Sequence, residues 1–522
     1  MLSLLVLTGC DSSFSQSSGL SSSSTSSNGS SESPTTSSST SGSSSTSIGS
    51  SSQSGAADGT YQFYAINDFH GSILENSSGN YYEGGLSKVG GYLKARKDAD
   101  PEHTFIISSG DMWQGSLESN DNYGACVTEA MNYIGFDSMT IGNHEFDYGQ
   151  SYILQNEAAA NFPFLGGNIM KWDGGTTSTP WGHSDISTVV ERGGIKVGII
   201  GMIGEGLTTS ITSKNVSDVI FVNPETLVEN EALRLKSEEG CSVVILSIHA
   251  DYSSVYGPWA ESDNLKSYLD GVFCAHTHYS NLFKTADGVP MLQAYCNGEA
   301  ISHFELAIKN GAVSCTKYEN ISASSSWSED AGIEEIESKY IGTEPFISKS
   351  TASCGNLVGS FTSSTIADAS CKAIYEKYKT VYGDLALAME NSQRASLYSG
   401  DVTYSALYKA TPFTNNIVIL RALGKDILNE AGYGQHTYTG DTSTYGNIVS
   451  TSYYKIAVID YVAYHQNIDK EYNYFNDLNN HPENILAEYD TYPVDVTFDY
   501  FKTLGGTINS SSFSGTGYNI YA

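Results

Sequence analysis

Residues 138–147 read SMTIGNHEFD, a short β-type run that ends at a glycine and is followed by polar side chains. The run Ser138–Ile141 predicts a strand, and Asn143, His144 and Asp147 come directly after it. In α/β sheets the loops at the carboxyl ends of strands converge on one crevice, where ligand sites assemble. The stretch therefore predicts an α/β fold with a polar site at this edge of the sheet.

The alternation of strand and helix continues on both sides of this stretch. Further strands are predicted at residues 61–67, 104–108, 196–201, 242–248 and 271–274. Helical patterns lie between them at residues 84–96, 124–134 and 224–238. Such alternation is typical of a layered α/β domain, which we expect to occupy residues 58–322.

A second, smaller domain is expected because 522 residues are too many for a single hydrophobic core. Residues 323–344 include a charged, helix-compatible stretch and are predicted to form a connecting helix. Residues 345–522 contain apolar runs of their own, at 416–420 and 455–462, and are predicted to form the second domain.

The chain is strongly acidic, with a formal net charge of −32. Binding to a nucleic-acid polymer or to an anionic membrane through bulk charge is excluded, since both need a basic face. A phosphorylated small-molecule substrate would therefore need a local positive charge to overcome the repulsion. A metal centre can supply that charge.

The N-terminus predicts a lipid anchor. Residues 7–10 read LTGC, which has the form of a bacterial lipobox with Cys10 as the acylated residue. Residues 1–10 are then a lipoprotein signal segment, and the serine-rich residues 11–57 are a flexible linker with too few apolar side chains to fold. No apolar run is long enough to predict a membrane-spanning helix. We expect a bacterial cell-envelope protein, periplasmic or on the cell surface, that meets the membrane only through this lipid.

An oxidising compartment permits disulfides among the other seven cysteines, at least one of which stays unpaired.

Aspartate, histidine and asparagine gather at the ends of five predicted strands. The segments are 67–71 (NDFHG), 110–113 (GDMW), 142–147 (GNHEFD), 247–249 (SIH) and 275–278 (AHTH). Hard or borderline divalent ions bind carboxylate oxygens together with imidazole nitrogens. Five such segments at one edge of a sheet offer enough ligands for two ions. The sequence therefore predicts a site for two divalent metal ions, such as zinc or manganese.

These segments resemble the signature blocks of the calcineurin-like metallophosphoesterases, and specifically of the 5′-nucleotidase family. The resemblance covers residues 61–310 strongly and residues 350–465 weakly. It implies a layered β-sandwich catalytic domain flanked by helices, followed by a smaller α/β substrate-binding domain. It also implies which residues hold the ions: Asp68, His70, Asp111 and His278 for one, and Asp111, Asn143, His249 and His276 for the other, with Asp111 bridging.

The resemblance implies hydrolysis of a phosphate ester. Two cations clamp the phosphate oxygens and lower the pKa of a bound water, which attacks phosphorus. By the same resemblance, His144 stabilises or protonates the leaving oxygen, and Asp147 orients the His144 ring. The sequence shows no Ser/His/Asp or Cys/His nucleophilic constellation, so we expect the activity to depend on metal.

In family members the second domain binds the nucleoside. The resemblance assigns this role to Asn391 and Arg394, in a loop two residues shorter than the family's, and to Phe413, as a ring that stacks on the base. The family's loop with a second stacking ring is replaced at residues 466–472, and an arginine expected shortly before residue 355 is absent. Substrate recognition is therefore expected to differ while the metal chemistry is retained. Tyr472 or Tyr474 would be the first candidate for a second ring.

The leading hypothesis is a 5′-nucleotidase that acts on nucleoside 5′-monophosphates. One alternative keeps the metal ions but changes the ester, to a 2′,3′-cyclic nucleotide, a nucleotide sugar or a thiosulfate ester. Another alternative is a surface binding lipoprotein without turnover. The complete ligand set and the presence of both His144 and Asp147 weigh against a pure binding protein.

Overall fold

Two six-stranded sheets pack face to face in the N-terminal half of the chain. The computed structural model describes residues 57–77, 81–173, 179–251, 253, 265–440, 448–464, 475, 478 and 481–513. The first sheet has the order β15-β14-β1-β2-β3-β4, and the second has the order β12-β13-β11-β10-β8-β7. The strands of the first sheet are β1 (Gly59–Ile66), β2 (Thr104–Ser108), β3 (Ser138–Thr140), β4 (Phe164–Leu165), β14 (Ala300–Lys309) and β15 (Ala312–Ser322). Those of the second are β7 (Ser187–Arg192), β8 (Ile195–Ile203), β10 (Val243–His249), β11 (Gly271–Phe273), β12 (Ser280–Lys284) and β13 (Pro290–Ala294).

Both faces of each sheet are buried because side chains on alternate sides of a strand enter different cores. In β1, Phe63 and Ala65 belong to the core between the sheets, whereas Tyr64 and Ile66 belong to the core beneath the helices. This double burial explains why the strands appear in the sequence as continuous apolar runs. All six strands predicted from the sequence are present.

Helices cover the outer faces of the sandwich. Helices α1 (Gly85–Ala99), α3 (Ala125–Ile134) and α8 (Ala331–Ile341) pack together over the first sheet, and α5 (Glu225–Ser237) packs on β8 and β10 of the second. The three helices predicted between the strands are therefore confirmed, and α8 occupies the predicted connecting segment. The remaining short elements of this half are α2 (Leu117–Asn120), α4 (Gln150–Ala159), α7 (Leu265–Tyr268), η1 (His144–Phe146), η2 (Leu207–Ser210), η3 (Ser213–Asn215), β5 (Ile169–Lys171), β6 (Thr179–Pro180) and β9 (Val219–Phe221).

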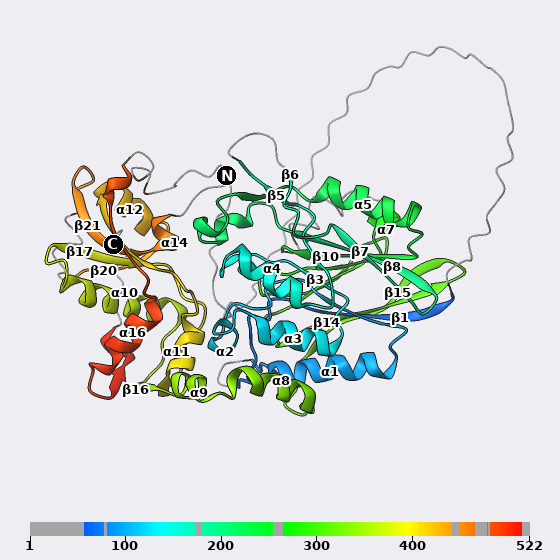
Figure 1. Ribbon diagram of the computed structural model, residues 1–522, viewed down its shortest axis with the longest axis horizontal. Coiled ribbons are helices and arrows are strands. Elements are labelled where there is room, and N and C mark those ends of the chain that lie inside the picture. Colours follow the sequence, from blue (N-terminus) through cyan, green and yellow to red (C-terminus); the bar gives the residue numbers. More distant parts are fainter. Residues whose placement is uncertain are drawn as a thin grey trace, which may run out of the picture.

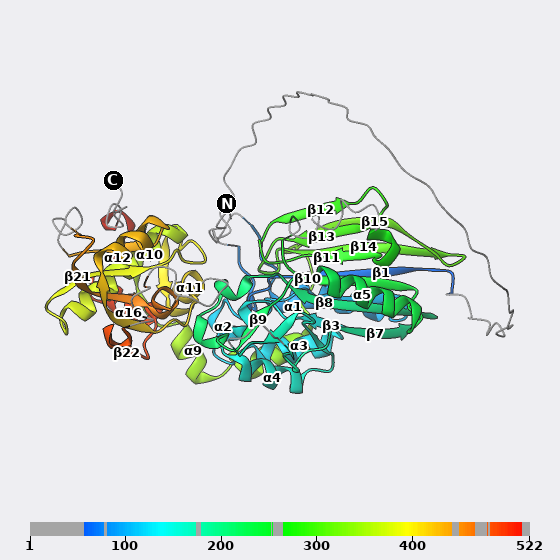
Figure 2. The same cartoon turned by 90° about the horizontal axis from the view of Figure 1, so that it is seen from above.

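The C-terminal half forms a separate lobe beside the sandwich in both views (Figures 1 and 2). It has a five-stranded sheet, β20-β17-β21-β19-β22, and a three-stranded sheet, β18-β16-β23. The strands are β16 (Ser353–Val358), β17 (Leu385–Glu390), β18 (Gly400–Thr403), β19 (Ile417–Leu423), β20 (His436–Tyr438), β21 (Tyr453–Ile459), β22 (Ile485–Tyr489) and β23 (Thr507–Asn509). The helices are α9 (Glu344–Ser350), α10 (Ser363–Lys379), α11 (Tyr404–Ala410), α12 (Gly424–Gly432), α14 (Asp460–Ala463), α16 (Pro493–Lys502), η5 (Pro482–Asn484) and η6 (Ser510–Ser512).

Polar contacts join the lobes at one edge of the sandwich. The Gln114 side chain donates to the Pro412 carbonyl at 3.0 Å, and the Asn120 amide donates to the Tyr408 hydroxyl at 3.0 Å. Loops that follow β2 and α11 are therefore held against each other. This contact places C-terminal residues beside the carboxyl ends of the sandwich strands.

The described residues include no helix with the length and apolarity needed to cross a bilayer. Cys126, Cys241, Cys274, Cys354 and Cys371 are buried thiols outside any disulfide. Cys10, the predicted acylation site, lies outside the described residues, as do Tyr472 and Tyr474.

Candidate active site

The five polar segments found in the sequence meet at one edge of the sandwich. Strands β1, β2 and β3 run parallel to one another, and β10 runs parallel to β11, so within each sheet these carboxyl ends lie side by side. The two sheets face each other, and the loops from both converge. Residues that lie up to 210 positions apart, from Asp68 to His278, thus enter one site.

The backbone at this site is held in a sparsely populated conformation. Nine described residues other than glycine have positive φ. Five of the nine are predicted metal ligands: Asp68 (48°), His70 (51°), Asp111 (55°), His276 (80°) and His278 (59°). Such conformations cost on the order of 1–3 kcal/mol each and cluster where function requires a fixed geometry. The strain is therefore concentrated on the predicted ligands.

One group of potential ligands consists of Asp68, His70 and His278. The Nε2 atoms of His70 and His278 are 2.9 Å apart, and Asp68 Oδ1 lies 3.4 Å from His278 Nε2. Their ligand atoms all lie within 4.8 Å of one another. This is the spacing of atoms that can share one cation.

A second group consists of Asp111, Asn143, His249 and His276. Asn143 Oδ1 lies 3.0 Å from His249 Nε2 and 3.0 Å from His276 Nδ1, and Asp111 Oδ2 lies 3.1 Å from His249 Nε2. Gly142 makes this approach possible, because a Cβ at that position would lie 2.2 Å from Asp111 Oδ1. The close approach of Asp111 therefore explains why residue 142 is a glycine.

Backbone carbonyls fix the orientation of two of the histidines. His70 Nδ1 lies 2.8 Å from the Gln114 carbonyl, and His249 Nδ1 lies 2.9 Å from the Ser109 carbonyl. A carbonyl can only accept, so each Nδ1 carries the proton and each Nε2 presents its lone pair to the site. Ligating histidines are characteristically held in this way.

The electrostatics of the site suit a cation. Burial, with the Arg394 guanidinium adding to it, holds the pKa of His70 well below its usual range, and burial beside His249 lowers the pKa of His276 to about 4. Burial opposes protonation of His249 as well, but the Asp111 carboxylate raises the pKa of His249 to about 9. His70 and His276 are thus neutral beside buried carboxylates, a donor set that zinc and manganese bind, and a metal ion at His249 would have to displace a proton.

One buried atom without a hydrogen bond tests whether the residues fit metal ions. Asp111 Oδ2 is buried and accepts no hydrogen bond, although Asp111 Oδ1 accepts one from the His144 backbone N–H at 2.8 Å. Buried polar atoms are nearly always satisfied, and the His249 Nε2 atom that lies 3.1 Å from Oδ2 presents a lone pair when His249 is protonated on Nδ1 alone. A cation beside Oδ2 fits this requirement.

His144 and Asp147 form a hydrogen-bonded pair next to the second group. His144 Nδ1 lies 2.7 Å from Asp147 Oδ2, and the two residues are three apart at the 3₁₀ turn η1. His144 is thereby held with Nε2 directed away from Asp147. The arrangement can present a proton on Nε2 to a group bound at the metal ligands.

Comparisons with known proteins agree with this geometry. The family model for calcineurin-like phosphoesterases matches residues 61–280, and the model for the 5′-nucleotidase C-terminal domain matches residues 347–432. The chain is a metallophosphoesterase of the 5′-nucleotidase type. It is a metal-dependent phosphoric ester hydrolase by this membership.

Known relatives span both domains. A 5′-nucleotidase of Vibrio cholerae is 25% identical over 426 residues, which are 72% of this chain and 75% of the relative. A 5′-nucleotidase precursor of Thermus thermophilus has a similar fold, with a TM-score of 0.67 at 18% identity, over 86% of this chain and 97% of that one. The sulfate thiohydrolase SoxB of Thermus thermophilus also has a similar fold, with a TM-score of 0.66 at 13% identity, over 87% and 95%.

The C-terminal domain of this metallophosphoesterase brings Arg394 to the candidate metal ligands. Arg394 Nη1 lies 2.9 Å from His70 Nε2, and Arg394 Nη2 lies 2.7 Å from Gln114 Oε1 and 3.3 Å from His144 Nε2. The guanidinium is also 5.2 Å from the centre of the Phe413 ring. The guanidinium of the second domain therefore lies close enough to contact an anionic group bound at the candidate metal ligands.

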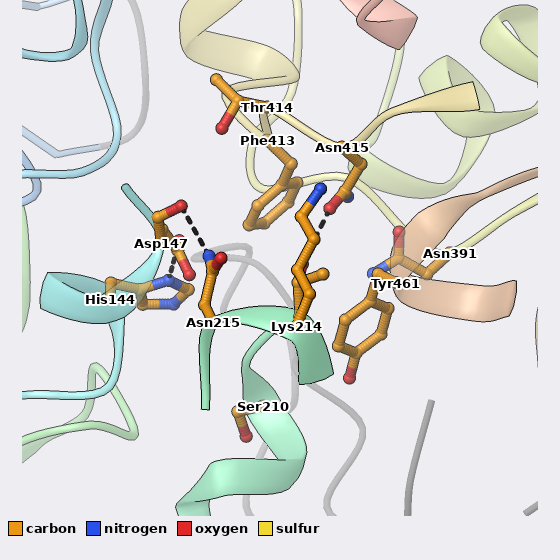
Figure 3. Close-up of a pocket in the computed structure, with 11 residues that line it drawn as sticks. His144, Asp147, Ser210, Lys214, Asn215, Asn391, Phe413, Thr414, Asn415 and Tyr461 are labelled. Atoms are coloured by element: carbon orange, nitrogen blue, oxygen red, sulfur yellow. Dashed lines mark hydrogen bonds and ion pairs between the residues drawn. The ribbon is translucent and has the colours of Figure 1, made fainter. Parts of the chain in front are cut away.

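Phe413 and Asn391 line a pocket between the domains (Figure 3). The catalytic domain contributes His144 and Asp147 to the same pocket, together with Lys214. The centres of the Phe413 and His144 rings are 6.3 Å apart. The predicted substrate-binding residues therefore lie next to the His144–Asp147 pair.

The sequence interpretation gave no role to Glu145. Glu145 accepts three backbone N–H bonds, from Asp111 at 2.8 Å, Met112 at 2.8 Å and Gly142 at 2.7 Å. Burial raises the pKa of Glu145 to about 8, with the Asp111 carboxylate adding to the effect and the backbone bonds opposing it. Glu145 ties the loops after β2 and β3 together. The position of Glu145 inside the 142–147 segment is the sequence feature that could have indicated a structural role for it.

Sequence reasoning also missed a hydrogen-bonded Ser/His/Asp grouping in the C-terminal domain. Ser392 Oγ lies 3.0 Å from His436 Nε2, and His436 Nδ1 lies 2.7 Å from Asp368 Oδ1. The three residues come from a loop, from β20 and from α10. Their bonds hold the short loop that carries Asn391 and Arg394 on the body of the C-terminal domain.

Proposed function

We propose that this enzyme is a 5′-nucleotidase, which removes the phosphate from nucleoside 5′-monophosphates at the interdomain site. The observation that carries the proposal is the contact of Arg394 with His70 and its proximity to His144. A residue of the 5′-nucleotidase C-terminal domain thereby adjoins the candidate metal ligands. A monophosphate bound at those ligands would have its remaining part directed toward Phe413.

Each residue has a role in this proposal. Asp68, His70 and His278 would hold one divalent ion, Asn143, His249 and His276 would hold the other, and Asp111 would be shared between them. The two ions, zinc or manganese, supply Lewis acidity at the phosphate oxygens and a water of lowered pKa. Arg394 binds phosphate oxygens, since a guanidinium matches their geometry. His144 donates a proton from Nε2 to the leaving oxygen while Asp147 accepts from its Nδ1–H, and Asn391 and Phe413 bind the nucleoside.

Chelation is expected to abolish hydrolysis of p-nitrophenyl phosphate, and added Mn²⁺, Zn²⁺ or Co²⁺ is expected to restore it. The ions are the proposed source of the water of lowered pKa that attacks phosphorus. The measurement is the turnover of the purified protein before chelation, after verified metal removal and after reconstitution. Turnover that persists in the metal-free protein, and that is lost in Ser392→Ala, would instead identify Ser392 as a metal-independent nucleophile.

Substrate preference is expected to be broad, with a raised KM for AMP. Phe413 is the ring that the resemblance assigns to the base, the family's second stacking loop is replaced at residues 466–472, and the Asn391–Arg394 loop is short. Loss of one stacking partner costs roughly 1–3 kcal/mol of binding. The measurement is kcat/KM for AMP, UMP, glycerol phosphate and p-nitrophenyl phosphate in the wild type, Phe413→Ala and Phe413→Leu, the last of which keeps apolar bulk without a π face. A preference for AMP above about a hundredfold that both variants abolish would show that the base is held on two sides, as a second ring would hold it.

The shortened loop also supports a second candidate function within the same chemistry. A 2′,3′-cyclic nucleotide, a nucleotide sugar or a thiosulfate ester would use the same metal ligands and a differently shaped second domain. Adding these three esters to the substrate panel decides between the candidates, since the preferred one has the largest kcat/KM.

We further propose that the enzyme works in the cell envelope, held by a lipid on Cys10 and the serine-rich residues 11–57. The support for this proposal is the lipobox-like sequence and the composition of the segment that follows it. A single lipid-bearing cysteine and a long tether would leave the catalytic domain away from the membrane surface.

A further inference from the structure

A short segment of the catalytic domain, Leu207–Asn215, connects the C-terminal domain to the His144–Asp147 pair. The segment consists of η2, η3 and the two residues between them. It lines the interdomain pocket through Ser210, Thr212, Lys214 and Asn215, as Figure 3 shows for the labelled residues. It contains none of the proposed metal ligands and neither residue of the proposed acid–base pair.

Three residues of the segment contact the C-terminal domain. The Tyr461 hydroxyl donates to the Thr209 carbonyl at 3.1 Å. The Thr212 hydroxyl donates to Asn415 Oδ1 at 3.3 Å. Lys214 Nζ donates to Asp460 Oδ2 at 2.6 Å. The segment is therefore bonded to the C-terminal domain over its whole length.

The ion pair of Lys214 with Asp460 dominates these contacts. The Asp460 side chain is 1% exposed, whereas that of Lys214 is 45% exposed. Burial raises the pKa of Asp460, and the Lys214 ammonium opposes this rise. A buried carboxylate that loses its cation is strongly destabilised, so the pair holds the segment in place more firmly than the two neutral bonds do.

The next residue along the chain contacts the catalytic pair. The Asn215 amide donates to the Asp147 carbonyl at 2.9 Å, and the Gln150 amide donates to the Asn215 carbonyl at 3.2 Å. Figure 3 shows the bond from Asn215 to Asp147 and the bond from Asp147 to His144. A continuous path of contacts thus runs from Asp460 through Lys214 and Asn215 to the His144 ring.

We propose that Lys214 is a positioning residue that makes full turnover depend on the docking of the C-terminal domain. Its ion pair with Asp460 fixes residues 207–215, and Asn215 then holds the turn that carries Asp147 and His144. The inference rests on the role proposed above for His144. It adds an energetic connection between the domain that recognises the substrate and the group that protonates the leaving oxygen.

Lys214→Met is expected to lower kcat for p-nitrophenyl phosphate roughly 10- to 100-fold, because small displacements of a catalytic group are costly. KM should stay within about twofold, since this substrate carries no nucleoside for the C-terminal domain to bind. Bound metal should be unchanged. Lys214→Arg keeps the charge and should restore kcat to within about threefold of the wild type. A rise in KM at unchanged kcat would make Lys214 a substrate contact and overturn the proposal.

Lys349→Met is the matched control. Lys349 Nζ pairs with Asp121 Oδ1 at 2.6 Å between the same two halves of the chain, and its side chain is also 45% exposed. Asp121 has no contact with the Asn215–Asp147 path among the contacts described above. The control should keep the wild-type kcat. An equal fall in both variants would mean that any loosening of the interface slows turnover, which would overturn the specific role of Lys214.

The double variant Lys214→Met/Asp460→Asn tests whether the two residues act as one pair. Its kcat should be no lower than that of Lys214→Met alone, since the interaction is already lost in the single variant. Additive losses would overturn the pairing. The use of p-nitrophenyl phosphate throughout separates this inference from the proposed substrate: failure to hydrolyse AMP would refute the nucleotidase proposal and leave this comparison intact.

Discussion

Asp111→Asn is expected to reduce turnover of p-nitrophenyl phosphate more than any other single ligand substitution, by about 10³- to 10⁴-fold, since a metal Lewis acid contributes several kcal/mol at the transition state. Asp111 Oδ2 is a buried atom that accepts no hydrogen bond, and the proposal has Asp111 shared by both ions. An amide in its place keeps the shape but removes the negative charge. The measurement is kcat together with the number of metal ions bound per chain, which should also fall.

Asp270→Asn provides the matched control for Asp111→Asn. Both carboxylates are almost fully buried, at 1% exposed for Asp111 and 2% for Asp270. Asp270 precedes β11 and accepts from the Val244 N–H at 3.0 Å, at the opposite end of that strand from His276. The control should bind metal and turn over normally. Normal metal content and normal kcat in Asp111→Asn would refute the bridging role.

His144→Ala is expected to slow turnover roughly 10²- to 10⁴-fold, the range for general acid–base groups, with metal content unchanged. The geometry behind this expectation is the 2.7 Å bond from Asp147 to His144 Nδ1, which leaves Nε2 for the leaving oxygen. The loss should be larger for glycerol phosphate than for p-nitrophenyl phosphate, because p-nitrophenolate leaves without needing a proton. The measurement is kcat for both esters in the wild type, His144→Ala and Asp147→Asn.

The outcome for metal content decides how His144 acts. Loss of bound metal in His144→Ala would make His144 a ligand, and an equal loss of kcat on both esters would argue against proton donation. His303→Ala is the control for removal of a buried histidine from the same domain. His303 is bonded to Glu319 at 3.0 Å and to Gln62 at 2.7 Å within the first sheet, and its removal should leave kcat unchanged.

The sequence predicted the catalytic half of the fold well because its signals are local. Strands buried on both faces appear as continuous apolar runs, and the segments after β2 and β3 each carry a glycine before their first ligand. The pair His144 and Asp147 is also local, since three residues of one 3₁₀ turn bring the two side chains together. Each of these features follows from a few neighbouring residues and could be predicted without a tertiary structure.

The Ser/His/Asp grouping was missed for the opposite reason. Ser392, His436 and Asp368 are ordinary polar residues in their own segments, and no local pattern marks them. They meet because α10 packs on β17 and β20 of the five-stranded sheet. Contacts of this kind depend on packing between distant elements, which composition and spacing do not specify.

The sequence by itself determined the fold class of the catalytic domain, the seven candidate ligands and the candidate acid–base pair, since each is encoded by side-chain chemistry at the end of a strand. Only the tertiary structure decided how the two halves cooperate. Arg394 reaches His70 across 324 positions of sequence, and Lys214 pairs with Asp460 across 246. The physical reason is that a buried or interfacial ion pair is selected by the packing of whole domains, whereas a ligand at a strand end is placed by its own strand.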